Sequence, residues 1–241
     1  MIDINTQNAL SREMRQAYSN FEKKTLPTIL EVSVGAPNAI EGITDQAKGL
    51  KSFAISMKGA ILDIAGVHFR TQADSTITEG GKLTRSANFA KTKLAQSKRD
   101  FAAKLSYAEP ELERLNTILD QAKQPPASAG QAAVDAELRA YIKTLEPSKA
   151  ISAVRANPDL MQAVARAPAV LSGLSADFHK AVVDDYLQSV KPAEFNQRED
   201  LTASMRAALQ AINFVETEAN SLIDFQTAAR LEGLKYTQAA A

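Results

Sequence analysis

The 241-residue sequence carries few of the side chains that perform chemistry. It contains two histidines, His68 and His179, and no cysteine. The lack of cysteine excludes disulfides, thiolate metal sites, iron–sulfur clusters and cysteine nucleophiles. A dinuclear carboxylate site in a helical bundle needs a glutamate three residues before each histidine, and those positions here are Ala65 and Ala176. We therefore predict no metal site and expect each histidine on a helix surface or partly buried.

Other catalytic patterns are also missing. Residues 79–84, Glu-Gly-Gly-Lys-Leu-Thr, contain residue types of a phosphate-binding loop without its spacing, and we expect a turn at Gly80 and Gly81. The chain has no Gly-x-Ser-x-Gly motif to present a serine nucleophile. The acidic pair Asp184 and Asp185 diverges on a helix, as adjacent residues do. We predict a protein that is not an enzyme, with no catalytic residue and no cofactor.

One segment has a local excess of positive charge, although 28 basic and 28 acidic residues balance over the whole chain. Most of its basic residues lie off the apolar face of a predicted helix, so we expect a basic contact face. These residues are Lys82, Arg85, Lys91, Lys93, Lys98, Arg99 and Lys104. Such a face contacts nucleic acid phosphates or an acidic protein surface, or only keeps the helix soluble. Because the net charge is zero, nucleic acid is a possible partner but not a favoured one.

Glycine and serine recur beside a heptad pattern in the first long predicted helix. Apolar residues from Ile40 to Ile64 follow one another at alternating steps of three and four, after a predicted capping residue, Asn38. Gly42, Gly49 and Ser56 lie seven residues apart beside this seam. Small residues in register allow another backbone to come close, so we predict that they form a helix-packing stripe.

Two more apolar seams predict long helices. One runs over residues 83–119 with Pro110 inside it, either at the start of a new helix or at a kink. The other runs over residues 201–229, within a predicted helix of roughly 40 residues, about 60 Å long. It includes a polar residue, Gln226, of the kind that sets register in coiled coils. Three long seams exceed what one small monomer buries, so we predict a homo-oligomer.

The stretch rich in proline, alanine and serine predicts a linker at residues 125–130. It would separate a long-helix region, 1–124, from a region of short helices and one long C-terminal helix, 131–241. Asn157 and Ser175 are predicted caps of short helices, and alternation at residues 30–34 is the only convincing strand signal. We predict an all-α fold, an elongated bundle of long heptad-patterned helices with a small cap of short helices.

Part of the C-terminal region resembles a known module. The segments that carry the resemblance are, in chain order, Asp135–Ile142, Ala156-Asn157-Pro158-Asp159-Leu160, Ala163–Ser175 and the helix with His179. The third segment includes Ala167-Pro168 and Leu171-Ser172-Gly173-Leu174. Together these segments, mainly over residues 135–190, look like a helical module of uncharacterised proteins of tailed bacteriophages and prophages. The resemblance carries no active-site residue. It implies a virion-associated protein.

These observations lead to one favoured function and two alternatives. We expect a non-enzymatic phage structural or assembly protein, which acts through helix–helix contacts with itself and other virion proteins. The alternatives are a nucleic-acid-associated internal or ejected virion protein and a membrane-interacting helical protein. The most apolar window, residues 53–67, contains Lys58 and Asp63 and is shorter than a membrane span, so a membrane partner is not expected. Without a signal-peptide pattern at its start, the chain is expected to be made in the host cytoplasm and to reside in the virion.

Overall fold

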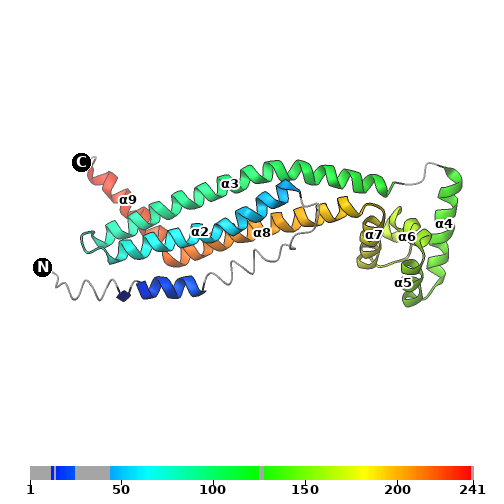
Figure 1. Cartoon of the computed structure of the whole chain (residues 1–241), viewed down its shortest axis with the longest axis horizontal. Helices are drawn as coiled ribbons and strands as arrows, with labels where there is room; N and C mark the ends of the chain where they lie inside the picture. Colours follow the sequence, from blue (N-terminus) through cyan, green and yellow to red (C-terminus); the bar gives the residue numbers. More distant parts are fainter. Residues whose placement is uncertain (1–11, 14, 25–43, 125–127, 240–241) are drawn as a thin grey trace. The chain divides into compact units, whose positions relative to one another are not determined.

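The structure is a computed structural model that describes residues 12–13, 15–24, 44–124 and 128–239 (Figure 1). All regular secondary structure in these residues is helical, which confirms the predicted all-α fold. A first helical segment covers residues 12–24 apart from residue 14. The labelled helices are α2 Asp45–Ala73, α3 Glu79–Ala122, α4 Ala129–Thr144, α5 Pro147–Ala156, α6 Pro158–Ala165, the 3₁₀ helix η1 Ala169–Leu171, α7 Ala176–Val190, α8 Pro192–Leu222 and α9 Phe225–Ala239. The predicted strand, the predicted cap Asn38 and Gly42 lie outside the described residues.

The chain divides into two compact units, but not at the predicted linker. One unit, which we call the bundle unit, contains residues 1–108 and 200–241, and the other, the short-helix unit, contains residues 109–199. These divisions differ from the predicted boundary at 125–130. Two long helices, α3 and α8, each continue from one unit into the other, so the boundaries fall inside helices. The C-terminal part of α8 belongs with the N-terminal helices instead of with its sequence neighbours.

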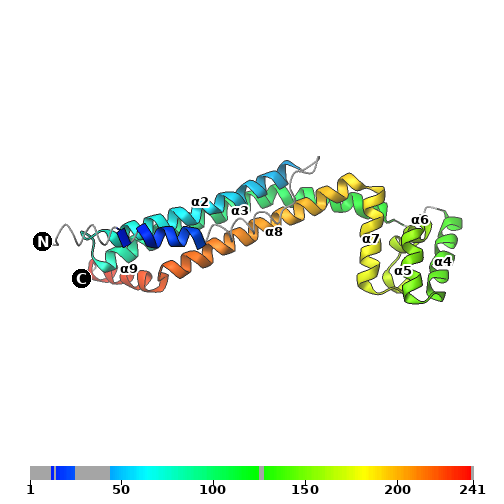
Figure 2. The same cartoon turned by 60° about the horizontal axis from the view of Figure 1, so that its bottom comes forward.

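In the bundle unit, α2, α3 and α8 lie side by side, as both views show (Figures 1 and 2). The predicted seam is buried along α2 from its first turn onward, at Ala47, Leu50, Ala54, Met57, Ile61 and Ile64. Two ion pairs link α8 to the other helices: Lys51 Nζ lies 2.7 Å from Asp200 Oδ1, and Lys98 Nζ lies 2.8 Å from Glu216 Oε1. The main stabilisation of such a bundle comes from the removal of apolar side chains, such as those of the α2 seam, from water.

The turn between α2 and α3 is set by capping side chains and not by the predicted glycines. Asp74 Oδ1 accepts a hydrogen bond from the Thr76 N–H at 2.9 Å. Thr78 Oγ1 accepts from the Gly81 N–H at 3.2 Å, as an N-cap does. Gly80 and Gly81 thus belong to the first turn of α3, so the predicted turn at these residues is wrong. A Cβ at position 81 would lie 2.9 Å from Ile77 Cγ2, so glycine makes room for that side chain.

The last helix is shorter than its apolar pattern predicts. Asp224 Oδ1 accepts a hydrogen bond from the Thr227 N–H at 2.9 Å, and Asp224 Oδ2 accepts from the Thr227 hydroxyl at 2.6 Å. This cap ends α8 at Leu222 and starts α9 at Phe225. The break interrupts the predicted seam between Leu222 and Phe225, and Gln226 is exposed beyond it. By contrast, Pro110 lies inside the single helix α3, which excludes a new helix start.

The short-helix unit has its own core and the predicted caps. Asn157 Oδ1 accepts from the Asp159 N–H at 2.9 Å, and Ser175 Oγ accepts from the Phe178 N–H at 3.3 Å. These contacts confirm both predicted helix starts. Ser128 caps α4, so the last two residues of the predicted linker are helical. The buried apolar cluster of α4–α7 consists of Ile142, Ala150, Val154, Leu160, Val164 and Val182.

Candidate functional site

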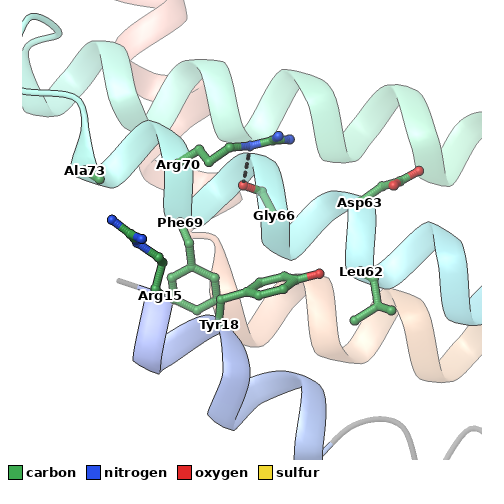
Figure 3. A pocket seen from close by; sticks show the side chains of 8 residues that line it. All are labelled: Arg15, Tyr18, Leu62, Asp63, Gly66, Phe69, Arg70 and Ala73. Atoms are coloured by element: carbon green, nitrogen blue, oxygen red, sulfur yellow. Dashed lines mark hydrogen bonds between the residues drawn. The ribbon is translucent and has the colours of Figure 1, made fainter. Parts of the chain in front are cut away.

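A cavity of about 610 Å³ lies between the first helical segment and α2 in the bundle unit (Figure 3). We call it the Tyr18 cavity. Its lining combines cationic, phenolic and apolar side chains: Arg15, Tyr18, Leu62, Asp63, Gly66, Phe69, Arg70 and Ala73. This volume is in the range of pockets that bind small molecules.

Aromatic packing positions the first helical segment against α2. The ring centroids of Tyr18 and Phe21 lie 6.2 Å and 6.3 Å from that of Phe69, in edge-to-face geometry. Such pairs add to the stabilisation that burial of the rings provides. Tyr18 and Phe21 are three residues apart, so they lie on the same side of this segment. Since Tyr18 also lines the cavity, the contact that docks the segment forms one wall of the site.

The polar groups of the cavity have defined partners. Arg70 Nε donates to the Gly66 carbonyl oxygen at 3.0 Å, so its guanidinium lies back along the helix. Asp63 Oδ2 accepts from Lys93 Nζ at 2.6 Å, and this pair neutralises the carboxylate. Burial first, and then the charges of Glu22 and Asp63, raise the pKa of Tyr18 above its usual value. Tyr18 therefore stays a neutral hydrogen-bond donor at neutral pH.

The predicted basic contact face does not form one continuous surface. Lys82 is buried and lies 2.7 Å from Glu79, while Lys93 and Lys98 pair with acids of α2 and α8. Lys104 is half-buried, and its Nζ lies beside Gly49. The exposed members are Arg85, Lys91, Lys98 and Arg99. The expectation of one exposed face is wrong because the acids that neutralise these lysines come largely from other helices of the same unit.

The predicted packing stripe borders a shallow groove between α2 and α3. A Cβ added at Gly49 would meet only Lys104 Nζ within 4 Å, at 3.8 Å, and Ser56 is exposed. No backbone of the described chain thus packs closely on Gly49. The groove has a volume of about 520 Å³, and we call it the α2–α3 groove. Its lining residues are Ser52, Phe53, Ser56, Asp100, Ala103, Lys104 and Tyr107.

The two histidines have different surroundings. His179 Nε2 lies 2.8 Å from the Ala167 carbonyl oxygen and 3.2 Å from that of Val164, so it donates a hydrogen bond that ties α7 to the end of α6. His68 is half-buried, with its ring centroid 5.3 Å from that of Phe69.

Within the described ranges, no group of three or more His, Cys, Asp or Glu side chains is placed to hold a metal ion. Nor does any described helix have an apolar stretch long enough to cross a bilayer.

His68 should make the stability of the bundle unit depend on pH. Burial lowers the pKa of His68 from its usual value of 6.5, so the unfolded chain takes up a proton before the folded chain does. Stability is therefore complete above about pH 6.5 and falls with decreasing pH until the folded-state pKa is passed. We expect the urea midpoint to be lower at pH 5.5 than at pH 7.5. His68→Gln should reduce this difference more than His179→Gln does, and equal pH dependence in parent and His68→Gln would contradict the assignment.

Sequence reasoning did not find the Tyr18 cavity. Its two walls are separated by more than 40 residues, and no spacing in the sequence connects Tyr18 with Phe69. The only available signal was the helical spacing of two aromatic residues, Tyr18 and Phe21. No protein-family model, curated protein or solved structure matches the chain.

Proposed function

We propose that this protein is a non-enzymatic structural or assembly component of a phage particle, which associates with copies of itself through helix–helix contacts. The observation that supports self-association best is the α2–α3 groove and the apolar side chains exposed beside it. The resemblance of residues 135–190 to a phage module supports the assignment to a virion.

The α2–α3 groove has the composition of a helix-packing surface. Its walls carry small side chains at Ser52, Ser56 and Ala103, which allow a neighbouring backbone to come close. Ile55 follows Ser52 by three residues, so it lies on the same side of α2. The exposed fractions of Ile55 and Tyr107 are 59% and 73%, which is high for large apolar side chains. Burial of the surface that each still exposes would favour association, by roughly 1–2 kcal/mol for Ile55.

The charges at the groove favour a second copy of the same chain as its occupant. Asp100 and Lys104 both line the groove and lie one helical turn apart on α3. In a two-fold symmetric pair the same surface contacts itself. If the two α3 helices run antiparallel, Asp100 of each copy faces Lys104 of the other. The zero net charge of the chain removes long-range repulsion between copies.

The groove predicts a change of oligomeric state upon substitution. The double variant Ile55→Asp/Tyr107→Asp places two charges in the interface, so it should be monomeric where the parent is oligomeric at micromolar concentration. Light scattering coupled to size-exclusion chromatography measures both masses. Val170→Asp is the matched control, because Val170 is 77% exposed and belongs to the short-helix unit, so it is not among the residues that line the groove. This control should keep the parent's mass. A monomeric parent, or a double variant that associates like the parent, would overturn this use of the groove.

The virion assignment has a separate test. Particles released from the strain that encodes the chain are purified on a density gradient and analysed by mass spectrometry. Peptides of this chain should be found at a constant ratio to the major capsid protein across the particle fractions. Their absence from intact particles would contradict the virion role and leave self-association as a distinct property.

A further inference from the structure

We propose that the Tyr18 cavity binds a small carboxylate whose carboxyl group is attached to an aromatic or acyl body. This goes beyond the structural role proposed above. The cavity joins a cationic region to an apolar wall, and both features come from side chains that the sequence places far apart.

The anion would bind near Arg70. The Arg70 side chain uses its Nε–H in the hydrogen bond to the Gly66 carbonyl, which leaves two amino groups as donors. A guanidinium binds a carboxylate through two parallel hydrogen bonds, a stronger arrangement than a bond between neutral groups. Arg15 also lines this cavity, from the first helical segment. Figure 3 shows Arg15 on the first helical segment and Arg70 on α2.

The other charged group in the lining has a counter-charge of its own. Asp63 is paired with Lys93 at 2.6 Å, which offsets part of its negative charge. The hydroxyl of Tyr18 points toward the Leu62 and Asp63 end of the cavity (Figure 3). As a neutral phenol, it can donate a hydrogen bond to a polar substituent there. The cavity therefore presents donors and positive charge to its ligand.

The remaining lining is apolar and suits a flat or extended hydrocarbon body. Phe69 and the ring of Tyr18 line the cavity together with Leu62 and Ala73. Gly66 carries no side chain between them, and a Cβ there would lie 3.8 Å from Tyr18 Cε2 and 3.9 Å from Arg70 Nη2. These are ordinary contact distances, so an alanine at position 66 fits without a clash. Its methyl group would reduce the volume of the cavity. The open backbone at Gly66 thus widens the cavity between the aromatic and cationic groups.

Two glycines of the same helix provide a matched pair of variants. A Cβ at Gly59 meets nothing within 4 Å, whereas a Cβ at Gly66 projects between Tyr18 and Arg70. Both positions are in the interior of α2, where alanine is favoured over glycine by up to about 1 kcal/mol. Gly59→Ala and Gly66→Ala should therefore both raise the thermal midpoint. Only Gly66→Ala should weaken binding.

The test uses 2-naphthoate, its neutral analogue 2-naphthamide, and decanoate, titrated into the full chain by isothermal titration calorimetry. We expect 2-naphthoate or decanoate to bind with a dissociation constant below 1 mM, which is about the weakest affinity of interest for a specific site. The relative affinities of 2-naphthoate and decanoate distinguish an aromatic from an acyl body. 2-Naphthamide should bind at least about tenfold more weakly than 2-naphthoate, because it lacks the charge that pairs with arginine.

The variants locate the binding. Arg70→Gln should weaken 2-naphthoate about tenfold and leave 2-naphthamide unchanged, and Gly66→Ala should weaken both relative to Gly59→Ala. Equal binding of the acid and the amide would overturn the role of the arginines. Equal binding by the two alanine variants would show that the ligand does not occupy this cavity. Failure of both acids to bind at 1 mM would overturn the proposal altogether.

Discussion

Lys51→Met is expected to destabilise the bundle unit by about 3–5 kcal/mol, because it leaves Asp200 buried without its counter-charge. The side chain of Asp200 is only 4% exposed, and that of Lys51 only 18%. Asp200 Oδ2 is also buried without a hydrogen-bond partner among the described residues, so the carboxylate depends on the ion pair at Oδ1. Urea denaturation followed by circular dichroism measures the change in the free energy of unfolding.

Two further variants separate the ion pair from other effects of the substitution. Lys51→Met/Asp200→Leu removes both charges, so its free energy of unfolding should return to within about 1 kcal/mol of the parent's or exceed it. Lys48→Met removes a charge from an exposed pair with Asp45 on the same helix. Its effect should be below about 1 kcal/mol. A single Lys51→Met variant as stable as the parent would show that the folded chain does not depend on this ion pair.

Leu201→Ala should cost about 2–5 kcal/mol, the range for a cavity opened in a packed core. Leu201 is fully buried in α8 and is the first residue of the predicted seam over 201–229. Leu209 lies on the same helix but is 48% exposed. Leu209→Ala makes the same chemical change without opening a cavity, so its effect should stay within about 0.5 kcal/mol.

Urea titrations at a fixed, low protein concentration compare these two leucine variants. The slope of the unfolding free energy against urea should remain that of the parent, since the surface exposed on unfolding changes little. If both variants lose the same stability, then either Leu209 is covered in an assembly or Leu201 is less tightly packed than its burial indicates. Repetition at a tenfold higher protein concentration distinguishes these cases.

The sequence by itself determined the helical character of the described chain and several helix starts. Periodic apolar residues and local caps act between residues a few positions apart, so their effect is already visible in a linear pattern. Asn157 and Ser175 are examples, because each caps the helix that begins directly after it. The buried seam of α2 was likewise predictable from residue spacing, since only one face of a helix packs on its neighbours.

Tertiary structure decided which residues share a unit and which charges are neutralised. Lys93 pairs with Asp63 of another helix, 30 residues away in the sequence. Lys98 forms an ion pair with Glu216, which is 118 residues away in the sequence, and no local pattern indicates this pair. The Tyr18 cavity arises in the same way, from helices that meet only in the fold. Contacts between distant segments form only when several helices pack against one another. The pattern of any one segment therefore does not predict them.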